Sequence, residues 1–255
     1  MKILEVIGVT KRFGRVMALK DVSFTHFEGE ILGVIGPSGA GKTTLVNLIT
    51  GSLSYSNGDI RFGGGSIRDL KPHQIGQLGI SRTFQVKPPL TKMSALENVM
   101  MGALFGRTER RRGGRAARRR AEEALDFLGL AGKKDIPIER LNGLERKRLE
   151  MAIAMAMNPK LLLLDEVMSG LNPTEIDVGV ALIKEVRDTG VTILVIEHVM
   201  KAIAKVSDRV VVLHHGEKIT EGPPEIVLND RQVIDAYLGK RYKATAALSK
   251  TEKII

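Results

Sequence analysis

The fold is decided by the stretch Ile31-Leu32-Gly33-Val34-Ile35-Gly36-Pro37-Ser38-Gly39-Ala40-Gly41-Lys42-Thr43. Its beginning, residues 31–35, is apolar and rich in β-branched side chains, which predicts a short buried strand. Residues 36–43 match the pattern GxxxxGK[ST], whose glycines let consecutive backbone N–H groups turn inward around a phosphate. Residues 42–50 have a helical pattern and stop at Gly51, a residue suited to the left-handed helix cap. Strand, glycine loop and helix therefore follow in the order that a phosphate-binding loop requires.

Two side chains of this loop have predicted roles in binding ATP and Mg²⁺. Lys42 would reach the β and γ oxygens of the nucleotide, and the Thr43 hydroxyl would be a ligand of Mg²⁺. The residues predicted to contact the nucleotide are Gly36, Pro37, Ser38, Gly39, Ala40, Gly41, Lys42, Thr43 and Thr44. A glycine-rich turn without a function is the competing interpretation, and the flanking strand and helix argue against it.

A second apolar strand is predicted at residues 161–164, and it delivers two carboxylates, Asp165 and Glu166, at its carboxyl end. Ligands bind at that end of the strands in open α/β sheets. Asp165 is predicted to hold Mg²⁺, directly or through water. Glu166 is predicted to be the general base, or the group that orients the attacking water. Strands often end in acidic residues, so this motif gains its weight from the phosphate loop.

The rest of the chain alternates between predicted strands and helices. Strands are predicted at residues 3–9, 22–27, 191–196 and 209–213, and helices at 174–188 and 199–206. Between about residues 75 and 157 the pattern is mainly helical, with a capping box from Ser94 to Glu97 and a further helix at 149–157. This rhythm is typical of an α/β protein with a parallel sheet and a helical insertion.

Composition limits the classes of function. The chain has 255 residues, of which 43% are hydrophobic, and it has no cysteine, so disulfides and cysteine-ligated metals are excluded. Its five histidines are scattered and leave little for a zinc site. No apolar run approaches the roughly 18 residues that a spanning helix needs, and residues 1–14 lack the long apolar core of a secretory signal. We therefore expect no export, and a membrane role only through a partner.

Much of the net charge of +10 lies in one segment. Residues 107–120 contain eight arginines against a single glutamate, Glu109. Three interpretations are open: a solvated loop and helix face, contact with anionic lipid headgroups, or nucleic-acid binding. Nucleic acid is the least favoured, because three Tyr, seven Phe and no Trp leave few side chains on which bases can stack.

Taken in order, the motifs resemble those of ATP-binding cassette (ABC) ATPase subunits, and the likeness covers nearly the whole chain. The order is the phosphate loop, Gln85 after a short strand, Leu141-Asn142-Gly143 opening a helix, Asp165-Glu166, and His198 after the next strand. The resemblance implies that Gln85 contacts Mg²⁺ and senses the permease, and that His198 contacts the γ-phosphate. It also implies that Phe13 stacks on adenine.

Within that family, several stretches resemble the larger ATPase of branched-chain amino acid importers. They are GISRTFQ at residues 79–85, ALENV at 95–99, SGLNP at 169–173 and AYLG at 236–239. The ATPase that powers lipopolysaccharide extraction has overlapping local motifs and remains the alternative.

The resemblance implies a P-loop NTPase of the ABC ATPase fold, with a mainly parallel core sheet, an N-terminal antiparallel β subdomain and an inserted helical subdomain. It assigns a single ABC ATPase domain to residues 1–240, the helical insertion to about 86–158 and a basic tail to 241–255. The implied partners are transmembrane permease subunits, a second ATPase subunit and, indirectly, a periplasmic or extracellular solute-binding protein, with no specific nucleic acid. The chain would be cytoplasmic and peripheral on the inner face of the cell membrane.

One motif departs from the family pattern. The signature normally reads LSGGQ and closes on the γ-phosphate bound by the opposite subunit, whereas this chain has Leu141-Asn142-Gly143-Leu144-Glu145. Asn142 can still cap the helix, with Glu145 as its capping-box partner. Leu144 puts a branched side chain where glycine lets the backbone approach phosphate. We therefore expect Asn142, Gly143, Leu144 and Glu145 to form a weakened trans contact, and we expect an asymmetric pair with a second ATPase.

Two other classes of function stay open. A nucleotide-dependent regulatory module with weak turnover fits the same phosphate loop, although the presence of Glu166 argues against it. Soluble ABC proteins that act on DNA or the ribosome usually carry two nucleotide units or a long coiled-coil insertion, and neither is seen in the sequence. Fold alone cannot choose the cargo.

Overall fold

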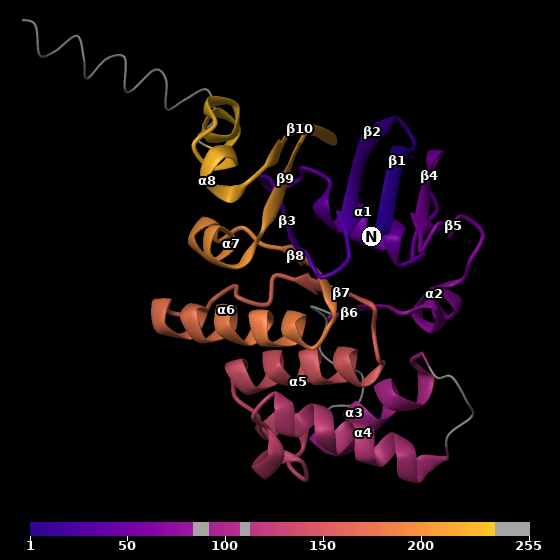
Figure 1. The fold of residues 1–255 in the computed structure, drawn as a ribbon, viewed down its shortest axis with the longest axis vertical. Coiled ribbons are helices and arrows are strands. Elements are labelled where there is room, and N and C mark those ends of the chain that lie inside the picture. The colour runs from indigo at the N-terminus through magenta and orange to yellow at the C-terminus, as the bar shows by residue number, and fades with distance from the viewer. Residues whose placement is uncertain (84–91, 108–112, 238–255) are drawn as a thin grey trace, which may run out of the picture.

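Two β-sheets and a group of helices make up the structure, a computed structural model that describes residues 1–83, 92–107 and 113–237 (Figure 1). The smaller sheet is antiparallel, with the order β2-β1-β4-β5. Its strands are β1 (Lys2–Phe13), β2 (Val16–Phe27), β4 (Asn57–Phe62) and β5 (Gly65–Ser66). The first two are longer than predicted, because they pair as far as Phe13 with Val16, through polar residues that a hydrophobic pattern does not reveal.

The larger sheet has six strands in the order β10-β9-β3-β8-β7-β6. Its strands are β3 (Ile31–Ile35), β6 (Ile80–Arg82), β7 (Leu161–Asp165), β8 (Thr192–Ile196), β9 (Arg209–His214) and β10 (Glu217–Gly222). All neighbours are parallel except β9 and β10. Strands β3, β7 and β8 are buried along their whole length, as expected for a parallel sheet covered on both faces. The predicted α/β fold class with a mainly parallel core sheet is confirmed.

Alternate side chains of β3 enter two different apolar cores. Ile31 and Ile35 pack with side chains from the helices on one face of the sheet. Leu32 and Val34 pack on the other face with the first helix and the antiparallel sheet. The strand that leads into the glycine loop is therefore held from both sides.

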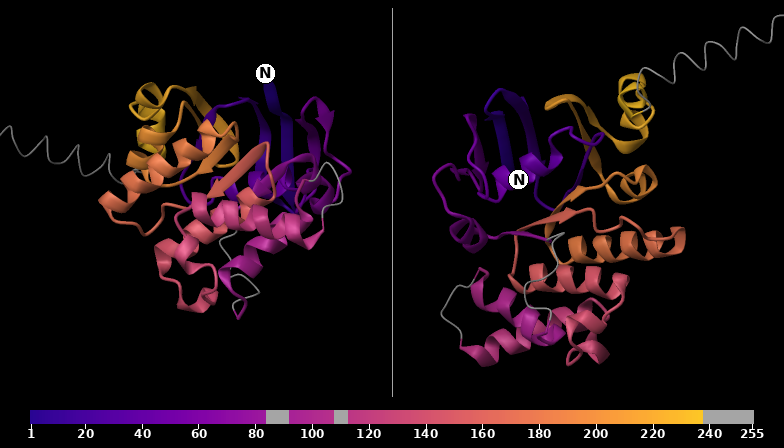
Figure 2. Two further views of the ribbon diagram at one scale, coloured as in Figure 1. Left: turned by 60° about the horizontal axis from the view of Figure 1, so that its bottom comes forward. Right: turned by 180° about the vertical axis from the view of Figure 1, so that it is seen from behind.

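The helices are α1 (Lys42–Ile49), α2 (Pro72–Leu78), α3 (Ala95–Phe105), α4 (Gly114–Phe127), α5 (Gly143–Ala156), α6 (Pro173–Asp188), α7 (Met200–Val206) and α8 (Pro224–Val227). Two short 3₁₀ turns, Ala131–Lys133 and Ile138–Arg140, lie between α4 and α5, and residues 231–237 are helical. Both views in Figure 2 show α3, α4 and α5 grouped at the end of the molecule away from the antiparallel sheet. No helix among the described ranges is long and apolar enough to cross a lipid bilayer.

Capping boxes define where three of these helices begin. Ser94 caps α3 with Glu97, and Asn142 caps α5 with Glu145, as predicted. Asn172 caps α6 in the same way with Glu175. Helix α5 is longer than the helix predicted at 149–157, because its first turns are polar and lack the apolar pattern on which that prediction relied.

Helices α3 and α5 touch through their backbones. A Cβ added to Gly102 would lie 2.3 Å from the carbonyl oxygen of Ile153, and one added to Gly106 would lie 2.3 Å from Cα of Met157. Contacts under about 3 Å do not occur for real side chains, so only glycine allows this approach. The two helices are therefore packed as closely as their peptide groups permit.

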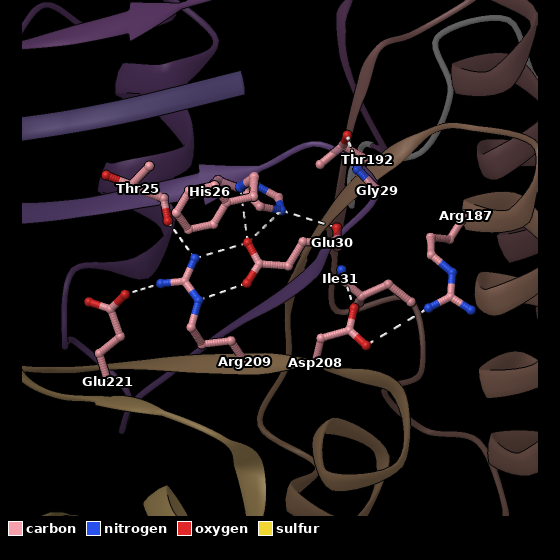
Figure 3. Close-up of polar contacts among 11 residues, drawn as sticks. Thr25, His26, Gly29, Glu30, Ile31, Arg187, Thr192, Asp208, Arg209 and Glu221 are labelled. Carbon is pink, nitrogen blue, oxygen red and sulfur yellow. Dashed lines mark hydrogen bonds and ion pairs between the residues drawn. The ribbon is translucent and has the colours of Figure 1, made fainter. Parts of the chain in front are cut away.

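Charged side chains join the end of the antiparallel sheet to the core sheet (Figure 3). Arg209, at the start of β9, makes a two-pronged ion pair with Glu30 at 2.7 and 2.9 Å, and also bonds to Glu221 and to the carbonyl oxygen of Thr25. His26 is fully buried beside them, with Nε2 3.1 Å from the carbonyl oxygen of Glu30. Burial lowers the pKa of His26 to about 4. These contacts fix β2 relative to β9.

Candidate nucleotide-binding site

The glycine loop lies at the carboxyl end of β3 and leads into α1. Gly36, Gly39 and Gly41 all have positive φ, at 154°, 79° and 106°. A Cβ added to Gly36 would lie 2.2 Å from the carbonyl oxygen of Leu213 on β9, so a larger residue would displace either the loop or the strand. Gly41 is the N-cap of α1 and offers no side-chain cap. The first turn of α1 is therefore open to an anion.

Lys42 is folded back over this loop. Its Nζ donates to the carbonyl oxygens of Gly36 at 2.6 Å and of Pro37 at 3.1 Å. Burial lowers the pKa of Lys42, while the negative charges of Glu166 and Asp165 act in the opposite direction. The ammonium group thus lies within electrostatic reach of both predicted carboxylates.

A cavity of about 230 Å³ runs along the loop. Its lining consists of residues 39–44, which include Thr43 and Thr44, together with Val16, Met17 and Ala18 of β2. Phe13 pairs with Val16 in the β1–β2 hairpin, and the residue is 46% exposed, with Nζ of Lys11 4.9 Å from the ring centroid. The exposed ring stands on the same hairpin that borders the cavity, where a planar base could stack on it.

The two carboxylates lie at the carboxyl end of β7, at the same edge of the sheet. Asp165 is the last residue of β7 and is buried. Glu166 has a left-handed backbone, with φ of 51°, and its N–H donates to the carbonyl oxygen of Ile196 at 2.8 Å. Its Oε1 lies 3.9 Å from Nδ1 of His198. The structure therefore brings Glu166 and His198 together, next to the glycine loop.

Arg82 and Thr83, at the end of β6, hold Asp165 from the other side. The Nη2 atom of Arg82 lies 2.7 Å from Oδ2 of Asp165, and its Nη1 donates to Oδ1 of Asn47 on α1 at 2.6 Å. The hydroxyl of Thr83 accepts the backbone N–H of Asp165 at 3.1 Å. Arg82 thus bridges the helix of the glycine loop and the carboxylate on β7.

A family model described as ABC transporter matches residues 19–169, a range that contains the glycine loop, the signature segment and Glu166. The chain belongs to the ABC transporter family. A second model, described as branched-chain amino acid ATP-binding cassette transporter, matches residues 217–243. The family resemblance indicated by the ordered motifs is confirmed.

Relatives match this ABC ATPase over nearly its whole length. The high-affinity branched-chain amino acid transport ATP-binding protein BraF of Pseudomonas aeruginosa is 37% identical over 250 residues, which is 93% of this chain and 98% of the relative. The corresponding protein LivG of Escherichia coli K12 is 35% identical, with the same coverage of both chains. A probable branched-chain amino acid transport ATP-binding protein of Archaeoglobus fulgidus is 37% identical over 94% of this chain and 96% of its own.

Solved structures of ABC cassettes have the same fold. A cassette in its ADP conformation matches with a TM-score of 0.87 and 31% identity, over 94% of this chain and 100% of the other. A dimeric cassette in a post-hydrolysis state, bound to ADP and phosphate, matches with a TM-score of 0.78 and 26% identity, over 87% and 99%. The chain is an ATP-hydrolysing cassette, and nucleotide binding is a property of its family.

The signature segment of this ABC ATPase opens α5. Oδ1 of Asn142 accepts the N–H of Glu145 at 2.9 Å, and the Glu145 carboxylate accepts the N–H of Asn142 at 3.0 Å. Gly143 is exposed and has open space where a Cβ would be. Leu144 is half-buried and borders a narrow apolar crevice with Lys147 and other residues of the chain's own core.

Sequence reasoning missed three charged residues near Glu166. Arg82 belongs to the stretch GISRTFQ at residues 79–85, from which a role was predicted only for Gln85. Its residue type and its place in that stretch were the only indications that Arg82 has a function. Lys147 and Glu197 had no signal, because their partners are backbone groups far away in the sequence. Three features of the sequence predictions lie outside the described residues: Gln85, residues 108–112 of the arginine-rich segment, and the tail at 241–255.

Proposed function

We propose that this chain binds and hydrolyses Mg–ATP to drive the uptake of branched-chain amino acids through a membrane permease. The assignment of the cargo rests on one observation. The chain is 35–37% identical, across nearly its whole length, to proteins described as branched-chain amino acid transport ATP-binding proteins. The short C-terminal match at residues 217–243 supports the same branch of the family.

The oxygen donors at this site suit Mg²⁺. The hydroxyl of Thr43 and the carboxylate of Asp165 are hard ligands of the kind that this ion takes together with water. Gln85, which lies outside the described residues, would add an amide oxygen if the predicted role holds. Held by these residues, Mg²⁺ would supply positive charge that offsets the negative charge of the phosphates. The buried carboxylate of Asp165 already pairs with the guanidinium of Arg82, so a cation is favoured at this position.

The protein's own groups would bind and orient the nucleotide. Backbone N–H groups of Gly36 and of residues 38–44, together with the Lys42 ammonium, would surround the phosphates, and Phe13 would stack on the base. Glu166 would accept a hydrogen bond from the attacking water and align it with the γ-phosphate. His198, beside Glu166, would contact the same phosphate and keep that carboxylate oriented.

Replacing Glu166 with glutamine tests the hydrolytic role. The variant should bind ATP with nearly unchanged affinity but lose at least about 100-fold in turnover, because an amide is a poor proton acceptor. Release of phosphate and binding of a fluorescent ATP analogue measure the two properties separately. Persistent hydrolysis would show that another group activates the water, and normal binding with no hydrolysis even in the unsubstituted chain would favour a regulatory module.

We infer that the partners are transmembrane permease subunits, a second ATPase subunit and, indirectly, a periplasmic or extracellular solute-binding protein, without specific nucleic acid. The chain would then lie in the cytoplasm on the inner face of the membrane. The helical insertion at about 86–158, which includes α3, α4 and α5, would be the part that moves with the permease.

Gentle cross-linking and copurification from native membranes test these partners. Mass spectrometry should find two permease subunits and a second ATPase. Lipopolysaccharide-export components would support the alternative transporter, and a salt-sensitive complex with nucleic acid would refute the transport assignment.

The signature segment leads to a proposal about the dimer. Leu144 replaces a glycine of the usual signature, so this chain would make a weak contact with nucleotide held by its partner, while its own loop and Glu166 remain complete. An asymmetric pair with a second ATPase would then hydrolyse ATP faster than a pure homodimer. Equal turnover by the homodimer and the reconstituted heterodimer would contradict this, and the double variant Asn142→Ser with Leu144→Gly should raise turnover by the homodimer.

A further inference from the structure

The loop at residues 166–171, between β7 and α6, begins in a disfavoured conformation. The φ of Glu166 is 51°, in the left-handed region, which costs a residue with a side chain roughly 1 to 2 kcal/mol. Its N–H is held by the carbonyl oxygen of Ile196, and its carbonyl oxygen accepts the N–H of Ser169 at 3.2 Å. Two side chains from outside the loop add further contacts to it.

Lys147 contacts the loop from the side of the helices. It lies on α5, and its Nζ donates to the carbonyl oxygen of Glu166 at 3.3 Å and to that of Ser169. Burial lowers the pKa of Lys147, while Glu197, Glu150 and Glu166 act in the opposite direction. An ammonium group in this half-buried place needs such acceptors, because it has lost part of its water.

Glu197 contacts the loop from the side of the sheet. It directly follows β8 and precedes His198, and its side chain is fully buried. Its Oε1 accepts the backbone N–H of Met168 at 2.6 Å, while Oε2 has no hydrogen-bond partner among the described residues. Burial raises the pKa of Glu197, and the N–H of Met168, His198 and Lys147 act against that rise. A buried carboxylate costs stability, so its place opposite the loop points to a specific task.

We infer that Lys147 and Glu197 are positioning residues that clamp this loop from two separate elements, α5 and the end of β8, and hold the backbone of Glu166 where its carboxylate faces His198. The inference rests on the proposed role of Glu166 in hydrolysis. Lys147 binds two carbonyl groups, and Glu197 binds an N–H group that lies between them in the sequence. Loss of the contacts of either Lys147 or Glu197 would let the loop relax toward an ordinary backbone conformation.

The clamp also has a consequence for the dimer. Lys147 lies on the helix that Asn142 opens, two residues after the segment expected to face the partner's nucleotide. A shift of α5 would therefore move the carbonyl groups that Lys147 holds. The orientation of Glu166 in a chain's own nucleotide site would therefore depend on the position of α5 in the same chain.

Lys147→Met tests the clamp, because it removes the charge and keeps much of the side chain. The measurement uses the complex purified from membranes through a tag on this chain, and the rate of interest is the wild-type turnover minus that of Glu166→Gln. We expect this Glu166-dependent turnover to fall about tenfold or more, because small misplacements of reacting groups have large effects on rate. ADP affinity should stay within about twofold, since Lys147 makes no described contact with the glycine loop.

Two further variants separate positioning from packing. Lys147→Arg can still donate to both carbonyl oxygens and should keep at least about a third of the rate. Lys205→Met is the matched control, because its ion pair with Asp177 lies on the exposed surface, and it should keep the full rate. Glu197→Gln keeps an acceptor for the N–H of Met168 and should remain active, whereas Glu197→Leu should lose turnover as Lys147→Met does.

The outcomes distinguish the clamp from the proposed function. If Glu166→Gln is inactive but Lys147→Met hydrolyses ATP at the wild-type rate, the clamp is wrong and the role of Glu166 stands. If Lys147→Met loses ADP binding together with turnover, its role is general packing and the inference is also wrong. If Glu166→Gln hydrolyses ATP like the wild type, the assignment of Glu166 fails and the clamp fails with it.

Discussion

Replacing Arg82 with methionine tests how much stability depends on the ion pair with Asp165. The side chains of Arg82 and Asp165 are 12% and 3% exposed and lie 2.7 Å apart, and Arg82 also donates to Asn47. Methionine keeps much of the side-chain volume but leaves a buried carboxylate without its ion partner. Breaking a buried pair in this way costs about 3 to 5 kcal/mol. For a chain of this size, that corresponds to a fall in Tm of roughly 10 °C.

Thermal unfolding followed by circular dichroism, in EDTA and without nucleotide, measures this effect. Arg61→Met is the matched control, because Arg61 and Asp59 also pair at 2.9 Å but their side chains are 49% and 25% exposed. An exposed pair contributes below about 1 kcal/mol, so this variant should unfold within roughly 4 °C of the wild type. Equal shifts in Tm for the two variants would refute the argument from burial.

Three further substitutions test other parts of the molecule. The pKa of His26 is lowered from 6.5 to about 4, so the folded chain resists protonation and loses stability as pH falls from about 6.5 to 4. Between pH 7.5 and pH 5, the free energy of unfolding in urea should fall by about 2 kcal/mol less in His26→Gln than in the wild type. The same fall with pH in both proteins would contradict this. Burial raises the pKa of Glu150 to about 7, so its contribution is lost as pH rises from 4.5 through 7. Glu150→Gln should add about 1 kcal/mol of stability at roughly pH 8 and nothing at about pH 5, whereas an equal gain at both would point to another cause. Gly36→Ala should weaken ADP binding about tenfold in a titration, because the new Cβ meets the carbonyl oxygen of Leu213, while Gly132→Ala, with open space around it, should not.

Elements with a local signal could be predicted from the sequence. Strands β3, β7 and β8 are continuous apolar runs, and their complete burial explains that pattern. The capping boxes at Ser94 and Asn142 depend on side chains three residues apart, so they too could be read directly. Strand β10 and the outer parts of β1 and β2 were not predicted, because their partly exposed residues owe their conformation to pairing with a neighbouring strand.

The candidate site divides in the same way. The glycine loop, Asp165, Glu166 and His198 lie at or after the ends of strands that could be located, and the carboxyl ends of parallel strands meet at one edge of a sheet. Arg82, Lys147 and Glu197 could not be assigned beforehand. Their bonds join residues from separate helices and strands, and two of the three act on backbone groups that no residue type reveals.

The contact of α3 with α5 at Gly102 and Gly106 has a mechanical meaning. Side chains between two helices can rotate and absorb part of a movement, but peptide groups already in contact can neither rotate aside nor be compressed. A displacement of α3 toward α5 would therefore be passed on to α5 almost undiminished. The start of α5 and the ammonium of Lys147 would then shift by nearly the distance through which α3 was pushed.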